Sequence, residues 1–226
     1  GFLASIIARQ FFFFFYEYAL LLMALATFGV GFFMRPVGGI LLGMYSDRKG
    51  RKAAMQMIIR LMTVSIALIA FAPNYAAIGM GAPLLIVVAR MLQGFATGGE
   101  YASATAFLVE SAPAHRKGLY GSWQLVGQCL AVFSGAGMVA LFTHLLTPEA
   151  LDSWGWRIPF MIGLLIGPVG LWIRKHMEEP EEFLEARKQA KGESPGLLQV
   201  IREHRRAILV SMGLACGATV SFYVVL

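Results

Sequence analysis

The chain has 226 residues, of which 58% are hydrophobic and 14% are charged, and its mean hydropathy is +0.66. Soluble domains carry about 25% charged residues. A soluble protein of this length could not bury so many apolar side chains, so the composition excludes that class and predicts an integral membrane protein.

The net charge is +6 and the isoelectric point is near 9.5, values that would also suit a nucleic-acid-binding protein. The basic residues, however, stand at the edges of apolar segments, as the positive-inside rule describes for membrane proteins. We therefore expect a lipid bilayer, and not nucleic acid, as the chain's surroundings.

The sequence carries none of the residue clusters that are typical of catalysis or metal binding. It shows no nucleophile–base pair, no phosphate-binding loop and no set of metal ligands, so we expect neither an enzyme nor a cofactor. Cys129 and Cys216 lie inside apolar stretches, and we interpret them as buried thiols without a disulfide.

The apolar segments, taken in chain order, predict transmembrane helices of about 20 residues or more. Five complete spans are expected at 18–43, 53–72, 83–109, 119–143 and 157–174. A sixth begins near Ala207, and residues 1–14 are similar to the tail of an earlier span, so we expect a chain that is cut at both ends. The run Phe11–Phe15 is either an interfacial aromatic belt or an irregularity of the sequence.

The links between these spans differ sharply in their content of Lys and Arg. Four basic residues lie in 44–52, two in 111–118 and eight in 174–206, against none in 73–82 and one in 144–157. Alternate links are therefore basic, which predicts that 44–52, 111–118 and 174–206 are cytoplasmic. The charged part of the last segment, 178–206, is expected to be an amphipathic or partly helical linker on the cytoplasmic membrane surface.

Two motifs in these basic links resemble the signatures of the major facilitator superfamily. They are GGILLGMYSDRKGRK at Gly38–Lys52 and LQGFATGGEYASATAFLVESAPAHRK at Leu92–Lys117. Three shorter stretches are similar to its metabolite:proton symporter branch, and in particular to citrate and tricarballylate symporters. They are MRPVGG (34–39), GWRIPF (155–160) and EEPEEF (178–183).

The resemblance implies the N-terminal six-helix half of a twelve-helix bundle with two halves. Most of helix 1 would be missing, and the start of helix 7 would be present. The expected parts are a helix 1 remnant with a Phe-rich link at 1–15, a transmembrane bundle at 16–175, a linker between the halves at 176–206 and the start of helix 7 at 207–226.

A polar stripe runs along the span 83–109. Because a helix has 3.6 residues per turn, four polar side chains fall on one of its faces, and such a stripe should line a water-filled cavity. They are Arg90, Gln93, Thr97 and Tyr101. The planar guanidinium of Arg90 suits a carboxylate, so the stripe is a candidate substrate site. The alternative is that Arg90 pairs structurally with an acidic residue elsewhere in the bundle.

Gln124 and Gln128 form a second polar pair on the span 119–143. They are four residues apart and therefore share one helix face. We interpret them as further substrate ligands, and interhelical hydrogen bonding is the alternative.

Charged residues inside a membrane are costly and therefore point to function. Glu100 is the candidate for proton coupling because desolvation favours the neutral form of a carboxyl group. The alternative is a permanent ion pair with Arg60 or Arg35. Arg60 itself is expected to be structural, either snorkelling or paired.

Proline and glycine residues mark places where helices bend or approach closely. Arg35 precedes Pro36, and we expect a gate or bend at that point, with contact to the substrate as the alternative. Gly94 and Gly98 form a GxxxG motif that predicts close helix packing. A similar series of small residues in the span 119–143 predicts a second packed face, and it consists of Gly127, Ala131 and Gly135.

The resemblance also implies a charged latch for the outward-open state. Asp47 would lie at the positive end of a helix of the missing half, where the helix dipole favours an acid. The latch would be completed by Arg51, with Glu110 and Arg116 as further candidates.

Together with these patterns, the resemblance implies a secondary transporter that imports a small carboxylate similar to citrate by proton symport and alternating access. It would be a multi-pass protein of the inner (plasma) membrane whose partners are the metabolite, the proton and the missing half. Transport of 2-oxoglutarate, shikimate, proline or betaine by the same fold is one alternative. A non-transporting membrane sensor or assembly module is another, and a channel is a third.

Overall fold

The structure is a computed structural model that describes residues 17–181, 183–185, 199 and 202–225. The chain divides into two compact units, Gly1–Glu185 and Ala186–Leu226, and each is considered by itself. The described residues form helices and no strands. The run Phe11–Phe15 and most of the predicted linker lie outside the described residues.

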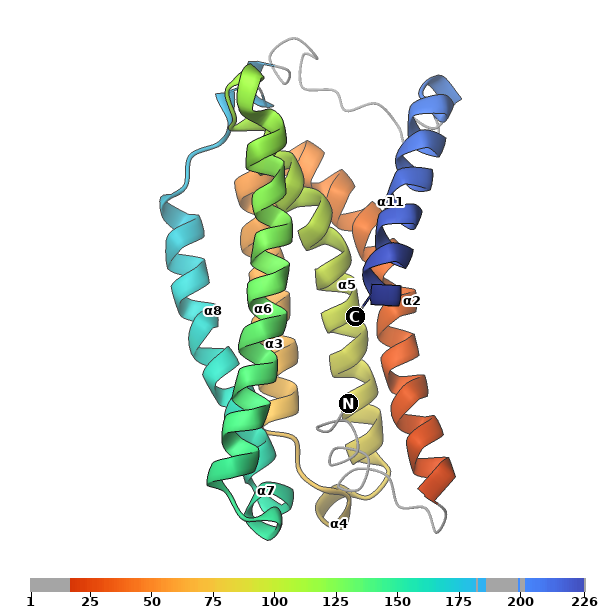
Figure 1. Ribbon diagram of the computed structural model, residues 1–226, viewed down its shortest axis with the longest axis vertical. Coiled ribbons are helices and arrows are strands. Elements are labelled where there is room, and N and C mark those ends of the chain that lie inside the picture. Colours follow the sequence, from red (N-terminus) through yellow and green to blue (C-terminus); the bar gives the residue numbers. More distant parts are fainter. Residues whose placement is uncertain (1–16, 182, 186–198, 200–201, 226) are drawn as a thin grey trace. The chain divides into compact units, whose positions relative to one another are not determined.

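The described part of the first unit is a bundle of five long helices (Figure 1). Short helices occupy the connections between them: α4 (Tyr75–Ile78), η1 (Ala114–Arg116), α7 (Pro148–Ser153) and η2 (Gly155–Arg157). The long helices are α2 (Glu17–Lys49), α3 (Arg51–Ala70), α5 (Gly81–Glu110), α6 (Lys117–Leu145) and α8 (Ile158–His176). Helix α5 packs against α2, α3 and α6, and α3 also packs against α8.

Among the residues that the structure describes, four helical segments are long and apolar enough to cross a membrane, judged by length and composition. They are Arg51–Ala70, Gly81–Glu110, Ala114–Leu145 and Gly155–His176. The remaining complete span, expected at 18–43, lies within α2. The all-helical membrane bundle predicted from the sequence is therefore confirmed.

The basic link expected at 44–52 is largely helical, and that boundary of the prediction is wrong. Helix α2 runs for 33 residues to Lys49, with Pro36 inside it. At 1.5 Å per residue it is about 50 Å long, well beyond a hydrocarbon core of about 30 Å. Because charged residues are good helix formers outside the bilayer, only Gly50 interrupts the path to α3, with φ at 108°.

Glycine allows α2 and α5 to cross at backbone contact. A Cβ atom on Gly94 would overlap the carbonyl oxygen of Gly31, and one on Gly98 would overlap that of Arg35. A Cβ atom on Gly38 would likewise meet the carbonyl of Phe95. The predicted close packing at Gly94 and Gly98 is confirmed, and its partner is α2.

The small residues expected to pack along α6 behave differently. A Cβ atom added to Gly127 or Gly135 would meet no described atom within 4 Å, and Ala131 is exposed. The second packing prediction is therefore wrong for the described part of the chain. No described residue of α6 is fully buried, because this helix has few neighbours in the bundle.

A different glycine series joins α8 to α3. Cβ atoms at Gly163, Gly167 and Gly170 would meet side chains of α3, at Ile66, Thr63 and Ile59 respectively. Each step along α8 is matched by a step of one turn along α3, so the two helices run side by side. This interface was not anticipated from the sequence.

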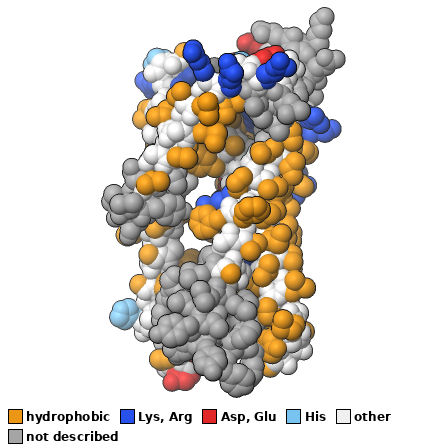
Figure 2. Space-filling model, turned by 90° about the vertical axis from the view of Figure 1, so that its right-hand side faces the viewer, with side chains coloured by type: hydrophobic (Ala, Val, Ile, Leu, Met, Phe, Trp, Pro, Cys, Tyr) orange, Lys and Arg blue, Asp and Glu red, His pale blue; other side chains and the backbone are white. Residues whose placement is uncertain are grey.

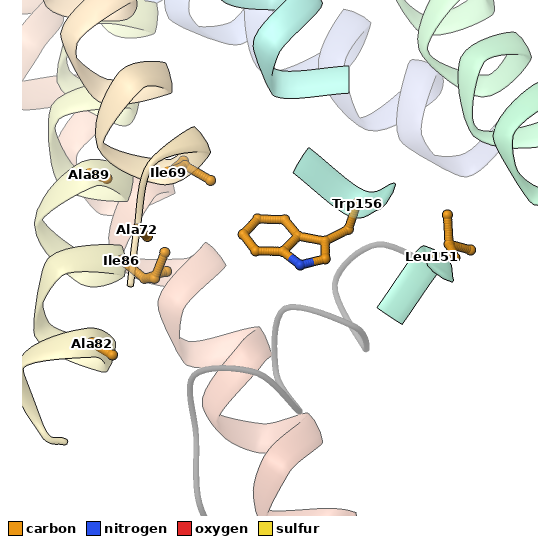
Figure 3. Close-up of a cluster of buried hydrophobic side chains, with 7 residues drawn as sticks. All are labelled: Ile69, Ala72, Ala82, Ile86, Ala89, Leu151 and Trp156. Carbon is orange, nitrogen blue, oxygen red and sulfur yellow. The ribbon is translucent and has the colours of Figure 1, made fainter. Parts of the chain in front are cut away.

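Trp156 closes one end of the bundle. Its side chain is 1% exposed and lies in a cluster contributed by the end of α3, the start of α5 and the α7–η2 segment (Figure 3). The other members of the cluster are Ile69, Ala72, Ala82, Ile86, Ala89 and Leu151. The neighbouring Arg157 donates from Nη2 to the carbonyl oxygen of Ala72 at 2.8 Å, just beyond the end of α3. The GWRIPF motif thus anchors the start of α8 to the end of α3.

The second unit contains α11 (Arg205–Val225), close to the helix expected from Ala207. Cys216 on this helix and Cys129 on α6 are both free and exposed, so their interpretation as buried thiols is wrong. Their sequence surroundings are apolar, but an apolar helix in a membrane protein can turn any of its faces outward.

Candidate functional site

Basic side chains gather at one end of the bundle. In Figure 1 the ends of α2, α5 and α8 lie at the same end as the starts of α3 and α6. Figure 2 shows Lys and Arg side chains concentrated at that end and hydrophobic side chains over much of the body. The exposed cations of the first unit there include Arg48, Lys49, Arg116 and Lys175.

Arg51 is the centre of an ion-pair network at this end. Its Nε and Nη2 donate to the two carboxylate oxygens of Glu110 at 3.0 and 2.8 Å, which is a bidentate pair. Its Nη1 donates to Asp47 Oδ1 at 2.6 Å and to Ser46 Oγ at 3.1 Å. The side chains of Arg51 and Glu110 are 15% and 22% exposed, whereas that of Asp47 is 59% exposed. The structure therefore brings together three of the predicted latch residues.

Glu179 adds a contact that sequence reasoning missed. Its carboxylate oxygens accept hydrogen bonds from the backbone N–H groups of Arg51 and Lys52, both at 3.0 Å. These groups are the first two amides of α3, where unpaired donors and the helix dipole favour an anion. The EEPEEF segment that follows α8 thus returns to cap α3.

The two other residues predicted for gating do not join this network. Arg116 in η1 is exposed and makes no ion pair with a described residue. Arg35 lies in α2 with its guanidinium carbon 4.1 Å from the ring centroid of Phe32, one helix turn earlier.

The predicted substrate stripe is continuous on α5. Arg90 Nη1 donates to Gln93 Oε1 at 2.8 Å, and Thr97 Oγ1 donates to the backbone oxygen of Gln93 at 2.8 Å. Arg90, Gln93 and Thr97 are partly buried, and Tyr101 is 51% exposed. The local contacts hold the Arg90 side chain along the helix face.

The six predicted ligands differ in their depth along α5 and α6. Because α5 and α6 meet at the same end of the bundle, depth can be counted from Glu110 and Lys117 at 1.5 Å per residue. Tyr101 is then about 14 Å deep, Gln124 about 11 Å and Gln128 about 17 Å, whereas Arg90 is about 30 Å deep. Gln93 is about 26 Å deep and Thr97 about 20 Å. Thr97 therefore lies between Arg90 and Gln93 and the upper group of Tyr101, Gln124 and Gln128.

Glu100 has a partner that differs from both predicted ones. Its Oε1 accepts a hydrogen bond from Arg174 Nη2 at 3.1 Å. The partners named in the alternative interpretation, Arg60 and Arg35, are therefore wrong. Arg60 is exposed on α3, and Arg35 contacts Phe32. Arg174 was counted only among the basic residues of a loop, because it stands beside Lys175 and His176 at the end of an apolar span.

Comparison with known proteins gives these helices a context. The family model of the sugar (and other) transporters matches residues 1–209. The citrate-proton symporter of Klebsiella pneumoniae is 37% identical over 225 residues, which are 100% of this chain and 50% of that protein. The proline/betaine transporter of Salmonella typhimurium is 36% identical over 235 residues, which are 100% of this chain and 47% of the relative.

The shikimate transporter of Escherichia coli is 37% identical over 229 residues, which are 100% of this chain and 52% of the relative. The chain thus spans about half the length of the curated relatives it matches. Among solved structures, the inward-open xylose transporter XylE from E. coli superposes with a TM-score of 0.65 at 18% identity. The match covers 92% of this chain and 53% of XylE, and it concerns the fold alone.

Proposed function

We propose a function from the premise that the chain belongs to the sugar (and other) transporter family of the major facilitator superfamily. In this proposal the chain supplies one half of a proton-coupled carboxylate importer. The chain is a multi-pass membrane protein, and its relatives are transporters. The second half would be a six-helix unit, and the two halves would rock about a substrate held between them. The bacterial inner membrane is the proposed location.

The observation that carries this proposal is the Arg90–Gln93 pair on α5. Citrate, proline, betaine and shikimate, which the relatives' names mention, all contain a carboxylate, and a guanidinium binds a carboxylate in a bidentate manner. We propose that Arg90 and Gln93, with Thr97, hold a carboxylate near the middle of α5. The upper group of Tyr101, Gln124 and Gln128 would contact the substrate at another stage of its passage.

Citrate-like tri- or dicarboxylates are the first candidate substrates, and shikimate, 2-oxoglutarate, proline or betaine are the alternatives. The decisive test is uptake of labelled citrate, shikimate and proline by the intact transporter in proteoliposomes, with and without an inward proton gradient. Uptake that ignores the gradient would contradict proton symport. Absence of saturable uptake would favour a channel, or a sensor that does not transport.

The Arg90→Lys variant tests the site. Lysine keeps the positive charge but lacks the planar fork, so uptake should fall by about 10²-fold, equivalent to about 3 kcal/mol of lost charge-assisted hydrogen bonding. Arg60→Lys is the matched control because Arg60 is an exposed arginine of a neighbouring helix. Equal uptake by the Arg90→Lys variant and the control would contradict the assignment of the site.

The network around Arg51 is proposed to be one side of a latch, with Asp47 presented to a helix of the second half. The Asp47 side chain is 59% exposed while Arg51 holds it at 2.6 Å, so it keeps surface for a partner. Asp47→Asn should shift the transporter toward inward-open states and leave substrate affinity within about twofold, a free-energy difference below about 0.5 kcal/mol. Accessibility of engineered cysteines on the two membrane sides would measure the shift, and a loss of affinity without one would refute the latch.

Glu100 is the proposed candidate for the acid that carries the proton, and a permanent ion pair is the alternative. The carboxylate is paired, but its side chain is still 37% exposed. Both roles are compatible with proton-coupled transport, since the proton could be carried by a residue outside the described part of the chain.

A further inference from the structure

The glycine series of α8 determines where Arg174 points. Gly163, Gly167 and Gly170 bring α8 against Ile66, Thr63 and Ile59 of α3. Arg174 follows Gly170 by four residues and therefore continues the same helix face. The next two residues, Lys175 and His176, are exposed, whereas the Arg174 side chain is only 17% exposed. Arg174 is the one cation of this terminal run that is directed into the bundle.

Arg174 contacts both neighbouring helices at once. Its Nη2 donates to Glu100 Oε1 on α5 at 3.1 Å, and its Nη1 donates to the backbone oxygen of Met55 on α3 at 2.8 Å. In return, Gln56 of α3 donates from Nε2 to the backbone oxygen of Arg174 at 3.4 Å. That oxygen lies in the last turn of α8, where carbonyl groups lack helical partners.

These contacts connect α8 to both α3 and α5, whereas glycine packing connects α8 to α3 alone. The glycine series connect α8 to α3 and α5 to α2. The Glu100–Arg174 pair connects α8 to α5 across 74 residues of sequence. The two side chains are partly buried, at 17% and 37% exposed, so removal of one charge leaves the other partly shielded from water without its partner and should destabilise the fold.

We infer that Arg174 is a positioning residue that fastens α8 to α5 through Glu100 and to α3 through the Met55 carbonyl. In this role Glu100 is a fixed anionic anchor, which is the permanent ion pair named above as the alternative to a proton carrier, and the three helices move as one body during transport. The inference rests on the proposed function only where transport is measured. The structural coupling between Arg174 and Glu100 can be measured without transport.

The test is a double-mutant cycle in the intact protein, purified in lipid nanodiscs. Arg174→Gln and Glu100→Gln should each lower Tm by about 2–6 °C, and the double variant should recover at least half of that loss. Arg60→Gln, which removes an exposed cation from α3, should change Tm by less than about 1 °C. Arg174→Lys keeps the charge but lacks the fork, so it should lie between wild type and Arg174→Gln and remains informative if a neutral variant does not fold.

Transport supplies the readout that distinguishes an anchor from a proton carrier. If Glu100 is an anchor, the Glu100→Gln/Arg174→Gln variant keeps uphill uptake driven by a proton gradient, with KM within about twofold of wild type and a reduced maximal rate. Loss of gradient-driven uptake with retained substrate exchange would overturn the inference, because Glu100 would then carry the proton. Additive Tm losses would overturn it as well. If neither the wild type nor any variant transports, the proposed function fails. The double-mutant cycle in Tm still shows whether Arg174 and Glu100 are coupled.

Discussion

At the scale of single residues, Gly50 and Glu179 together form the junction between α2 and α3. Gly50 adopts φ of 108°, which L side chains rarely adopt, and a Cβ atom there would overlap the Glu179 carboxylate. The absence of a side chain lets Glu179 reach the first two amides of α3. Glycine is therefore needed at this position both for its backbone conformation and for access to the cap.

Removal of the Glu179 carboxylate should destabilise the protein through this cap. We expect Glu179→Ala to cost about 0.5–2 kcal/mol, the range for loss of a helix N-cap, and to lower Tm by a few degrees. Glu178→Ala is the matched control because Glu178 is exposed and adjacent. Thermal unfolding in nanodiscs measures both, and equal effects of the two variants would show that the cap contributes nothing.

Arg51 shows why one of four clustered cations differs from the rest. Its guanidinium uses three nitrogens to reach Glu110, Asp47 and Ser46 at the same time. The exposed Arg48 and Lys49 one turn earlier contribute charge to the basic end without such geometry. The run of cations therefore combines a topological signal with a single residue that holds α2, α3 and α5 together.

At the scale of helices, the bundle is organised by close backbone approach rather than by large buried side chains. Helices in a bilayer gain little from burying apolar surface, because lipid is equally apolar, so van der Waals contact and hydrogen bonds drive their association. The crossing of α2 and α5 and the pairing of α3 with α8 both depend on glycine. On α6, a Cβ atom at Gly121 would only touch Val109 of α5, at 3.6 Å, and one at Gly127, Gly135 or Gly137 would meet nothing within 4 Å.

This difference between helices predicts opposite results for the same substitution. Gly94→Val places a branched side chain against the Gly31 carbonyl, so it should separate α2 from α5 and lower Tm by about 5 °C or more, given the cost of overpacking. Gly127→Val on α6 meets open space and should leave Tm within about 2 °C. Thermal unfolding of the two variants in nanodiscs provides the comparison, and equal losses would contradict the assignment of the α2–α5 interface.

At the scale of the whole molecule, the first unit is polarised along its length. The Arg51 network and the Glu179 cap lie where α2 ends and α3 begins, and the apolar Trp156 cluster lies where α3 ends and α5 begins (Figure 3). We propose, from the positive-inside rule, that the basic end faces the cytoplasm.

This orientation can be tested by cysteine accessibility. After Cys129 and Cys216 are replaced by serine, single cysteines at Asn74 or Glu149 should react with a membrane-impermeant maleimide in right-side-out vesicles. Cysteines at Lys49 or His115 should react only after the membrane is permeabilised. All four positions are exposed in the structure, so a reversed pattern would contradict the proposed orientation.

The sequence by itself determined the helical spans, the alternation of basic and non-basic links between them and the basic end of the bundle. Hydropathy and charge are properties of short segments, so no tertiary contact is needed to find them. It also indicated the Asp47–Arg51–Glu110 group through the family resemblance, and it indicated the stripe on α5 through helical periodicity. The contacts of Glu100 with Arg174 and of Glu179 with α3 were decided only by the tertiary structure. They join residues 74 and 127–128 positions apart, and each acid had several cations or helix ends available in the sequence. The helix partners of the glycine residues were likewise decided only by the tertiary structure. A glycine motif shows where another helix can approach the backbone, and only the packed bundle shows which helix does so.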